Sequence, residues 1–144
     1  MVFWENQRIV TELYIQKMRG VCVQFGLTQM EFNIMMFLSD MPEHDTATDV
    51  IRIRMFTKSH VYSAVKTLED KGYITKVFSD SDKAAHLKLL EKANEVIDAG
   101  HIARKDFASQ LLVGFSDEEK DKCRQFLHRM CDNARIGLES EELY

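Results

Sequence analysis

The sequence predicts a mainly α-helical protein with one small β-hairpin. Three observations lead to this class: apolar residues recur at helical spacing through most of the chain, cap motifs precede several of these segments, and a single stretch near residues 73–90 is rich in β-branched and aromatic residues. With 144 residues, 45% apolar and 29% charged, the chain is long enough for one domain with a buried core. Its net charge of −4 is too small to keep such a chain extended.

The N-terminal part is predicted to form three helices. Residues 3–21 carry an apolar stripe at helical spacing, and Gly26 ends this segment. The motif Thr28–Glu31 has the form of a capping box and opens a second helix. Pro42 lies in the loop that follows, and Thr46–Asp49 caps a short third helix.

A fourth helix before Gly72 separates an apolar stripe from a polar one. The apolar stripe comprises Val61, Ala64, Val65 and Leu68, and the polar stripe comprises Ser59, Tyr62, Ser63 and Lys66. The segments YITKVF and HLKLL then read as the two strands of a hairpin. A long helix is expected from Glu91 to about Gly114, and Ser116–Glu119 caps a last amphipathic helix.

This order of elements is that of a winged helix-turn-helix domain framed by additional helices. We expect residues 27–90 to form the winged helix-turn-helix DNA-binding region. Residues 1–26 and 91–144 are then a helical dimerisation region, because their apolar stripes are more than one small winged domain can cover.

Four blocks of the sequence, in order, resemble the MarR family of bacterial transcription regulators. They are LTQMEFNIMMFL, FTKSHVYSAVKTLEDKGYITKV, LKLLEKANEVI and GFSDEEKDKCRQFLHRM, and the resemblance covers about residues 12–133. It implies a homodimer with a helix in the major groove and a wing beside the minor groove. The family usually carries an Asp-x-Arg pair in the wing, where this chain has Ser81 and Lys83. Lys83 replaces the planar arginine fork with a single point charge, which weakens the expected minor-groove contact.

The candidate DNA-binding residues lie mainly on the fourth helix. Between Arg52 and Lys76 there are six cationic and two acidic residues, a net charge of +4. Thr57, Lys58 and Ser59 suit phosphate contacts, and His60, Tyr62, Ser63 and Lys66 suit base edges, with Lys83 in the wing. The alternative is an ordinary solvated helix face with Thr57 as its N-cap.

Methionines and cysteines allow further hypotheses. Met18, Met30, Met35 and Met36 lie in helices that wall a ligand pocket in the family the chain resembles, so a small apolar or aromatic ligand is one interpretation, and plain core packing is the more common one. Cys123 and Cys131 lie on the apolar stripe of the last helix, whereas Arg19 near Cys22 is a weak indication of a reactive thiol.

Several other classes are excluded by missing motifs. The three cysteines form no C-x-x-C pair, and the sequence holds no phosphate loop, nucleophile elbow or zinc motif, so we expect no enzyme, no cofactor and no metal. The absence of a membrane-spanning run or signal peptide predicts a cytoplasmic protein.

The predicted function is a dimeric, sequence-specific DNA-binding regulator that recognises a near-palindromic operator in double-stranded DNA. Repression that a ligand relieves is implied by the resemblance. Two alternatives stay open: a winged-helix protein-interaction module that has lost DNA binding, and a regulator that senses oxidants through a thiol.

Overall fold

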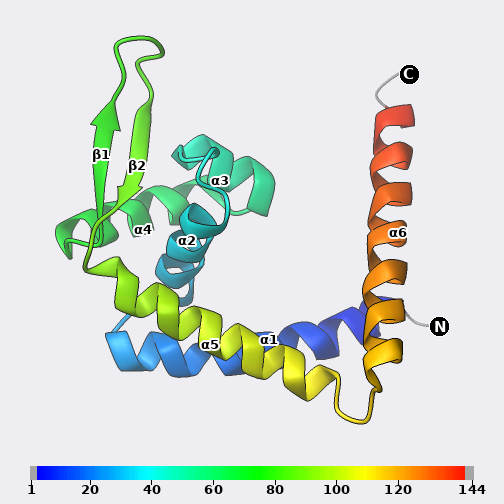
Figure 1. Ribbon diagram of the computed structural model, residues 1–144. Helices are drawn as coiled ribbons and strands as arrows, with labels where there is room; N and C mark the ends of the chain where they lie inside the picture. Colours follow the sequence, from blue (N-terminus) through cyan, green and yellow to red (C-terminus); the bar gives the residue numbers. More distant parts are fainter. Residues whose placement is uncertain (1–2, 142–144) are drawn as a thin grey trace. The chain divides into compact units, whose positions relative to one another are not determined.

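The computed structural model describes residues 3–141, which form six helices and one two-stranded sheet (Figure 1). The mainly helical class with a small wing is confirmed. The elements are α1 Phe3–Phe25, α2 Gln29–Asp40, α3 Ala47–Arg54, α4 Lys58–Asp70, β1 Ile74–Phe78, β2 Ala85–Leu89, α5 Ala93–Leu111 and α6 Asp117–Glu141.

The chain divides into two compact units, Met1–Phe107 and Ala108–Tyr144. The first unit contains α1 to α4, the wing and most of α5, and so it contains the predicted winged helix-turn-helix. The second unit contains α6 and the end of α5.

Side-chain caps set the starts of α2 and α3, as predicted. The Glu31 amide donates to Thr28 Oγ1 at 3.1 Å, and Glu31 Oε2 accepts from the Thr28 amide at 2.8 Å. Thr46 and Asp49 form the same reciprocal pair, at 3.1 and 3.2 Å. These bonds satisfy amides that a helix start otherwise leaves without a partner, so both helix starts are determined locally.

Helix α2 is the centre of the core. Its side chains Phe32, Ile34, Met35 and Met36 are at most 1% exposed. The predicted apolar stripe of α4 is buried in the same cluster. Gly100 brings α5 so close to α2 that a Cβ atom at this position would lie 2.6 Å from Met36 Sδ. The hydrophobic side chains therefore form one continuous core in this unit.

The hairpin strands lie within one residue of their predicted positions. They pair antiparallel with Ile74 opposite Leu89 and Phe78 opposite Ala85. An isolated bridge between Thr46 and His86 attaches β2 to the segment before α3. The turn between the strands extends away from the helices (Figure 1). The wing is therefore attached to the segment before α3 through the first half of β2.

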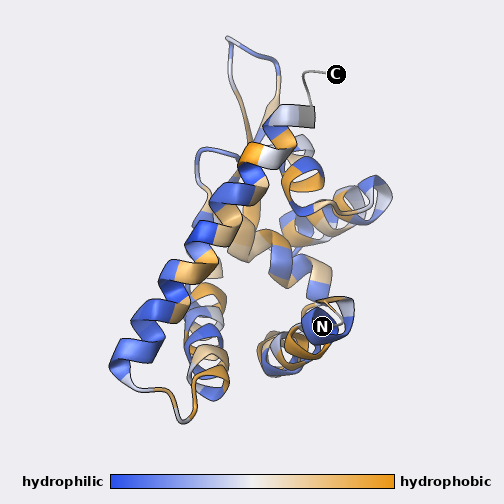
Figure 2. Ribbon diagram, turned by 90° about the vertical axis from the view of Figure 1, so that its right-hand side faces the viewer, coloured by the Kyte–Doolittle hydropathy of each residue, from blue (hydrophilic) through white to orange (hydrophobic). Residues whose placement is uncertain are grey.

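Helix α6 begins with a third capping box, formed by Ser116 and Glu119 as predicted. Apolar and polar residues alternate along this helix (Figure 2), and its large apolar side chains are exposed, for example Phe126 at 59% and Met130 at 61%. Cys123 and Cys131 are exposed on it too. None of the described residues of α6 is buried, so its apolar stripe is left uncovered.

Among the described residues, no single helix is long and apolar enough to cross a membrane. Helices α1 and α2 reach that length and apolarity only when taken together, and the pair is bent by 99° at its junction.

Candidate nucleic-acid interface

Helix α4 exposes a polar face because its apolar face is buried in the core. Val61, Ala64, Val65 and Leu68 are all buried, whereas Ser59, His60, Tyr62, Ser63 and Lys66 are all exposed. Tyr62 leaves 47% of its surface accessible. A large aromatic side chain on an otherwise polar, exposed face is suited to contact with a partner molecule.

Thr57 precedes α4 but does not cap it with its side chain. Its backbone is extended, and its carbonyl accepts from the Val61 amide at 3.1 Å, but its hydroxyl makes no capping bond. Thr57 is therefore the N-cap of α4 by its backbone, without a side-chain capping bond. The hydroxyl and the first amides of α4 instead remain available to an anion such as a phosphate.

Half of the cations counted between Arg52 and Lys76 belong to ion pairs within the fold. Lys71 pairs with Glu31 at 3.2 Å, Lys76 with Glu69 at 3.8 Å, and Arg52 with Asp49 at 3.4 Å. Within residues 3–141, the other three cations of this segment, Arg54, Lys58 and Lys66, have no carboxylate within 4.0 Å. These three carry the positive charge that can face a polyanion.

Aromatic rings hold two of these three cations. The guanidinium carbon of Arg54 lies 4.8 Å from the centroid of the Phe56 ring, and Lys58 Nζ lies 5.9 Å from that of Tyr62. Such contacts restrict a long side chain without neutralising it. Arg54 was counted in the charge of this segment but not among the candidate contacts, because a pattern of spacings gives no indication of this stacking.

Lys83 lies on the turn of the wing, apart from the α4 residues. Its backbone is left-handed, with φ of 57°, and its side chain is exposed. The neighbouring Asp82 accepts a hydrogen bond from the Ala84 amide at 3.1 Å and lies 2.9 Å from His86 Nε2. The position of Lys83 is thus set by contacts of its acidic neighbour.

The four candidate ligand-binding methionines do not share one pocket. Met18, Met35 and Met36 are at most 1% exposed in the filled core. Met30 instead lines a surface hollow of about 270 Å³ together with His60 and Ser63 of α4. Ligand binding by all four would require the core to repack, so the hypothesis is limited to a site that is not preformed.

The buried cysteine is Cys22. Burial raises the pKa of its thiol, and this effect outweighs the backbone hydrogen bond, which lowers the pKa. A raised pKa keeps the thiol protonated and therefore unreactive at neutral pH. This environment favours a packing role for Cys22 over redox sensing.

A cluster that the sequence interpretation missed links the turn end of the wing to the segment between α2 and α3. Asp45, Asp82, His86 and Lys88 come together there. The one signal in the sequence is that His86 and Lys88 are two residues apart in a predicted strand and so share one face of it. Nothing in the spacing identifies Asp45 as their partner.

Helices α2 to α4 followed by a β-hairpin define a winged helix-turn-helix protein. Helix α4 is the second helix of its helix-turn-helix motif, and its polar face is exposed. Residues 25–85 match the model of the MarR family. This match confirms the resemblance to the family that was predicted from the sequence.

Solved structures share this fold over nearly the whole chain. The Staphylococcus aureus MepR–DNA complex aligns with 17% identity and a TM-score of 0.71, covering 93% of this chain and 96% of MepR. A MarR family protein from Bacillus stearothermophilus aligns with 20% identity and a TM-score of 0.75, covering 91% of each chain. The transcriptional regulator Tm0710 from Thermotoga maritima aligns with 23% identity and a TM-score of 0.67, covering 95% and 96%. No curated protein matches the chain in sequence.

Proposed function

We propose that this protein is a dimeric, sequence-specific DNA-binding transcription regulator with α4 as its recognition helix. The observation that carries the proposal is the exposed polar face of α4, with Tyr62 and Lys66 on it, above a buried apolar face. A helix that enters the major groove needs this combination of donors and a rigid support. The fold that the chain shares with MepR, which was solved in complex with DNA, supports the same assignment.

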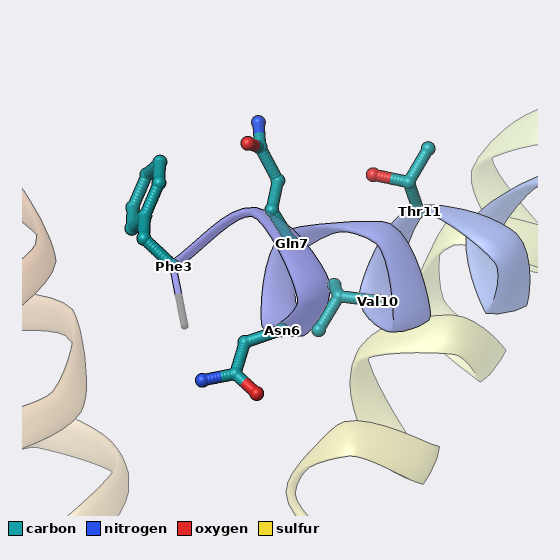
Figure 3. A pocket seen from close by; sticks show the side chains of 5 residues that line it. All are labelled: Phe3, Asn6, Gln7, Val10 and Thr11. Atoms are coloured by element: carbon teal, nitrogen blue, oxygen red, sulfur yellow. The ribbon is translucent and has the colours of Figure 1, made fainter. Parts of the chain in front are cut away.

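A second copy of the chain is the proposed occupant of the exposed apolar surfaces. Helix α6 leaves Leu127 and Ile136 more than half exposed, and α1 leaves Trp4 75% exposed. Near the start of α1, Phe3 and Val10 line an open hollow (Figure 3). Apolar surfaces of this extent are typical of obligate homodimers, in which they become a shared core. A dimer would also present two copies of α4 to a near-palindromic operator.

The proposed regulatory mode is repression that a small apolar or aromatic ligand relieves. The buried methionines support it, because Met side chains have several rotatable bonds and can repack around a ligand. Such a ligand would have to displace Met36 from its contact with Gly100, and this would change how α5 packs against α2. No catalytic step is part of the proposal.

Binding to duplex DNA across a salt series tests the central claim. Affinity should fall linearly in log salt between about 50 and 200 mM, with a slope that counts the phosphates neutralised. Replacing Lys66 by Ala should flatten the slope by about one unit if Lys66 meets a phosphate. Lys105→Ala is the matched control, because Lys105 is exposed on α5, outside the proposed face.

Two results would contradict the proposal. An affinity that hardly changes with salt would favour a protein-interaction module instead. Equal losses in the Lys66 and Lys105 variants would show that the charge acts through the whole molecule and not through α4.

A further inference from the structure

The imidazole of His86 is placed between two carboxylates. Its Nδ1 lies 2.6 Å from Oδ1 of Asp45, and its Nε2 lies 2.9 Å from Oδ2 of Asp82. Asp45 belongs to the segment between α2 and α3, and Asp82 belongs to the turn of the wing. The ring therefore joins the tip of the wing to the body of the domain.

Only the imidazolium form can make both bonds. An ionised carboxylate only accepts hydrogen bonds, so each ring nitrogen must carry a proton to donate. Neutral histidine has a proton on one nitrogen alone and would face one of the two carboxylates with a lone pair. The geometry thus specifies a histidine that carries a charge.

The surrounding groups favour this charge. Lys88 Nζ donates to the other oxygen of Asp45 at 2.6 Å, so the four side chains together carry no net charge when His86 is protonated. Of the neighbouring charged or titratable groups, His44 lies 4.0 Å from Glu43, Asp49 holds the Thr46 cap and Arg52, and the exposed Asp80 and Lys83 share the turn with Asp82. On β1 the residue opposite His86 is the uncharged Val77.

The direction of the pKa shift agrees with the geometry. The hydrogen bond to Asp45 and then the one to Asp82 raise the pKa of His86 above its ordinary value. For Asp45, burial acts to raise the pKa, but the bonds from Lys88 and His86 prevail and lower it. A raised histidine pKa means that His86 makes both hydrogen bonds at and below the ordinary histidine value of about 6.5. One of the two bonds is lost as the pH rises through the raised pKa.

Deprotonation should release Asp82 and not Asp45. The Asp45 side chain is only 12% exposed. The backbone of Asp45 is also fixed to β2, because its carbonyl oxygen accepts a hydrogen bond from the Leu87 amide at 2.7 Å. The Asp82 side chain is 48% exposed and can exchange its bond to His86 for water. The proton on Nδ1 therefore stays with Asp45, and the turn that carries Lys83 loses its tie to His86.

We propose that His86 is a positioning residue that clamps the wing turn through Asp82, so that one proton controls where Lys83 is held for DNA contact. The clamp itself is a property of the fold, and its effect on DNA rests on the proposed function. Loss of the proton acts twice on that function, since it frees the turn and leaves the cluster with a net negative charge beside the phosphate backbone.

Histidine NMR of the whole 144-residue chain, titrated from about pH 6 to 9, tests the clamp without DNA. His86→Gln assigns the resonance. The titration midpoint of His86 should lie above about 6.5 and should fall when Asp82 is replaced by Asn. The amide signals of Ser81 and Lys83 should shift with the same midpoint. Asp80→Asn is the matched control, because it removes an equal charge from the same turn without breaking the contact.

Duplex DNA binding over the same pH range tests the consequence. In the wild type, affinity should fall with rising pH, by at most about tenfold per pH unit for each linked proton. In Asp82→Asn, this fall should move to lower pH. Comparison of the two proteins cancels any contribution of His60, which both contain.

The outcomes separate the two claims. A His86 midpoint at or below the ordinary value, turn amides that do not follow it, or an equal effect of Asp80→Asn overturns the clamp, whatever DNA does. A normal clamp in NMR with no duplex binding at any pH overturns the proposed function and the link to Lys83, and supports the clamp alone.

Discussion

Lys71 Nζ lies 3.2 Å from Oε1 of Glu31 and ties the end of α4 to the start of α2. The same ammonium group donates to the Gly26 carbonyl at 3.1 Å. The side chain of Glu31 is only 4% exposed, and it also completes the Thr28 capping box. One carboxylate therefore stabilises a helix start and fixes the helix that we propose to read DNA.

Replacement of Glu31 by Ala should destabilise the protein by about 2 to 3 kcal/mol, because both the cap and an ion pair with a buried carboxylate are lost. Urea unfolding at fixed protein concentration measures this change. Glu69→Ala is the control, since the Glu69–Lys76 pair is exposed, and such pairs contribute about 1 kcal/mol or less. Equal effects of the two substitutions would show that the Glu31 contact adds nothing beyond surface charge.

Gly100→Ala should destabilise the protein although alanine favours helices. The new methyl group would lie 2.6 Å from Met36 Sδ and 3.1 Å from Phe32 Cε2, and both neighbours are buried. Overpacking of this kind costs about 1 to 3 kcal/mol, which is more than the helix propensity gained. The thermal midpoint should therefore fall.

Gly20→Ala is the control for Gly100→Ala, and we expect it not to lower the thermal midpoint. Gly20 is also helical, and no atom lies within 4 Å of the position of its added Cβ, so the thermal midpoint should rise or stay level. A rise for both variants would mean that α5 moves away from α2 without strain.

Tyr62→Ala should separate specific from nonspecific DNA binding. Because Tyr62 is exposed and its neighbours on the inner face are not, the variant should fold normally. Loss of a contact to a base edge or methyl group should cost about 1 to 3 kcal/mol per half-site on the preferred duplex. Nonspecific affinity should change little. Competition between preferred and random duplexes measures the ratio, and an unchanged ratio would exclude Tyr62 from sequence reading.

Asp49→Asn should destabilise the protein at neutral pH and much less in acid. Burial acts to raise the pKa of Asp49, but hydrogen bonds from Thr46 and Arg52 prevail and lower it. The carboxylate thus contributes stability above its unfolded pKa of about 3.9, and this contribution is lost as the pH falls through the lower folded pKa. Urea unfolding at about pH 7 should show a loss of about 1 kcal/mol, in line with a weakened cap. A loss that persists below about pH 3 would point to packing instead.

The helices and their starts could be predicted from the sequence because both depend on neighbours along the chain. The Thr28–Glu31 and Thr46–Asp49 boxes close within one helical turn, and the period of 3.6 residues assigns each side chain of α4 to one face. Burial of Val61 and Leu68 then leaves Tyr62 and Lys66 outward. The proposed reading face therefore follows from local pattern alone.

The availability of charges and the contacts of the wing were decided only by the tertiary structure. Lys71 meets Glu31 across 40 residues, which removes a cation from the count for the polar face. His86 meets Asp45 across 41 residues, and Met36 meets Gly100 on another helix. Such pairs depend on how the elements pack, and periodicity specifies only which face of an element is buried, not which residue lies opposite it.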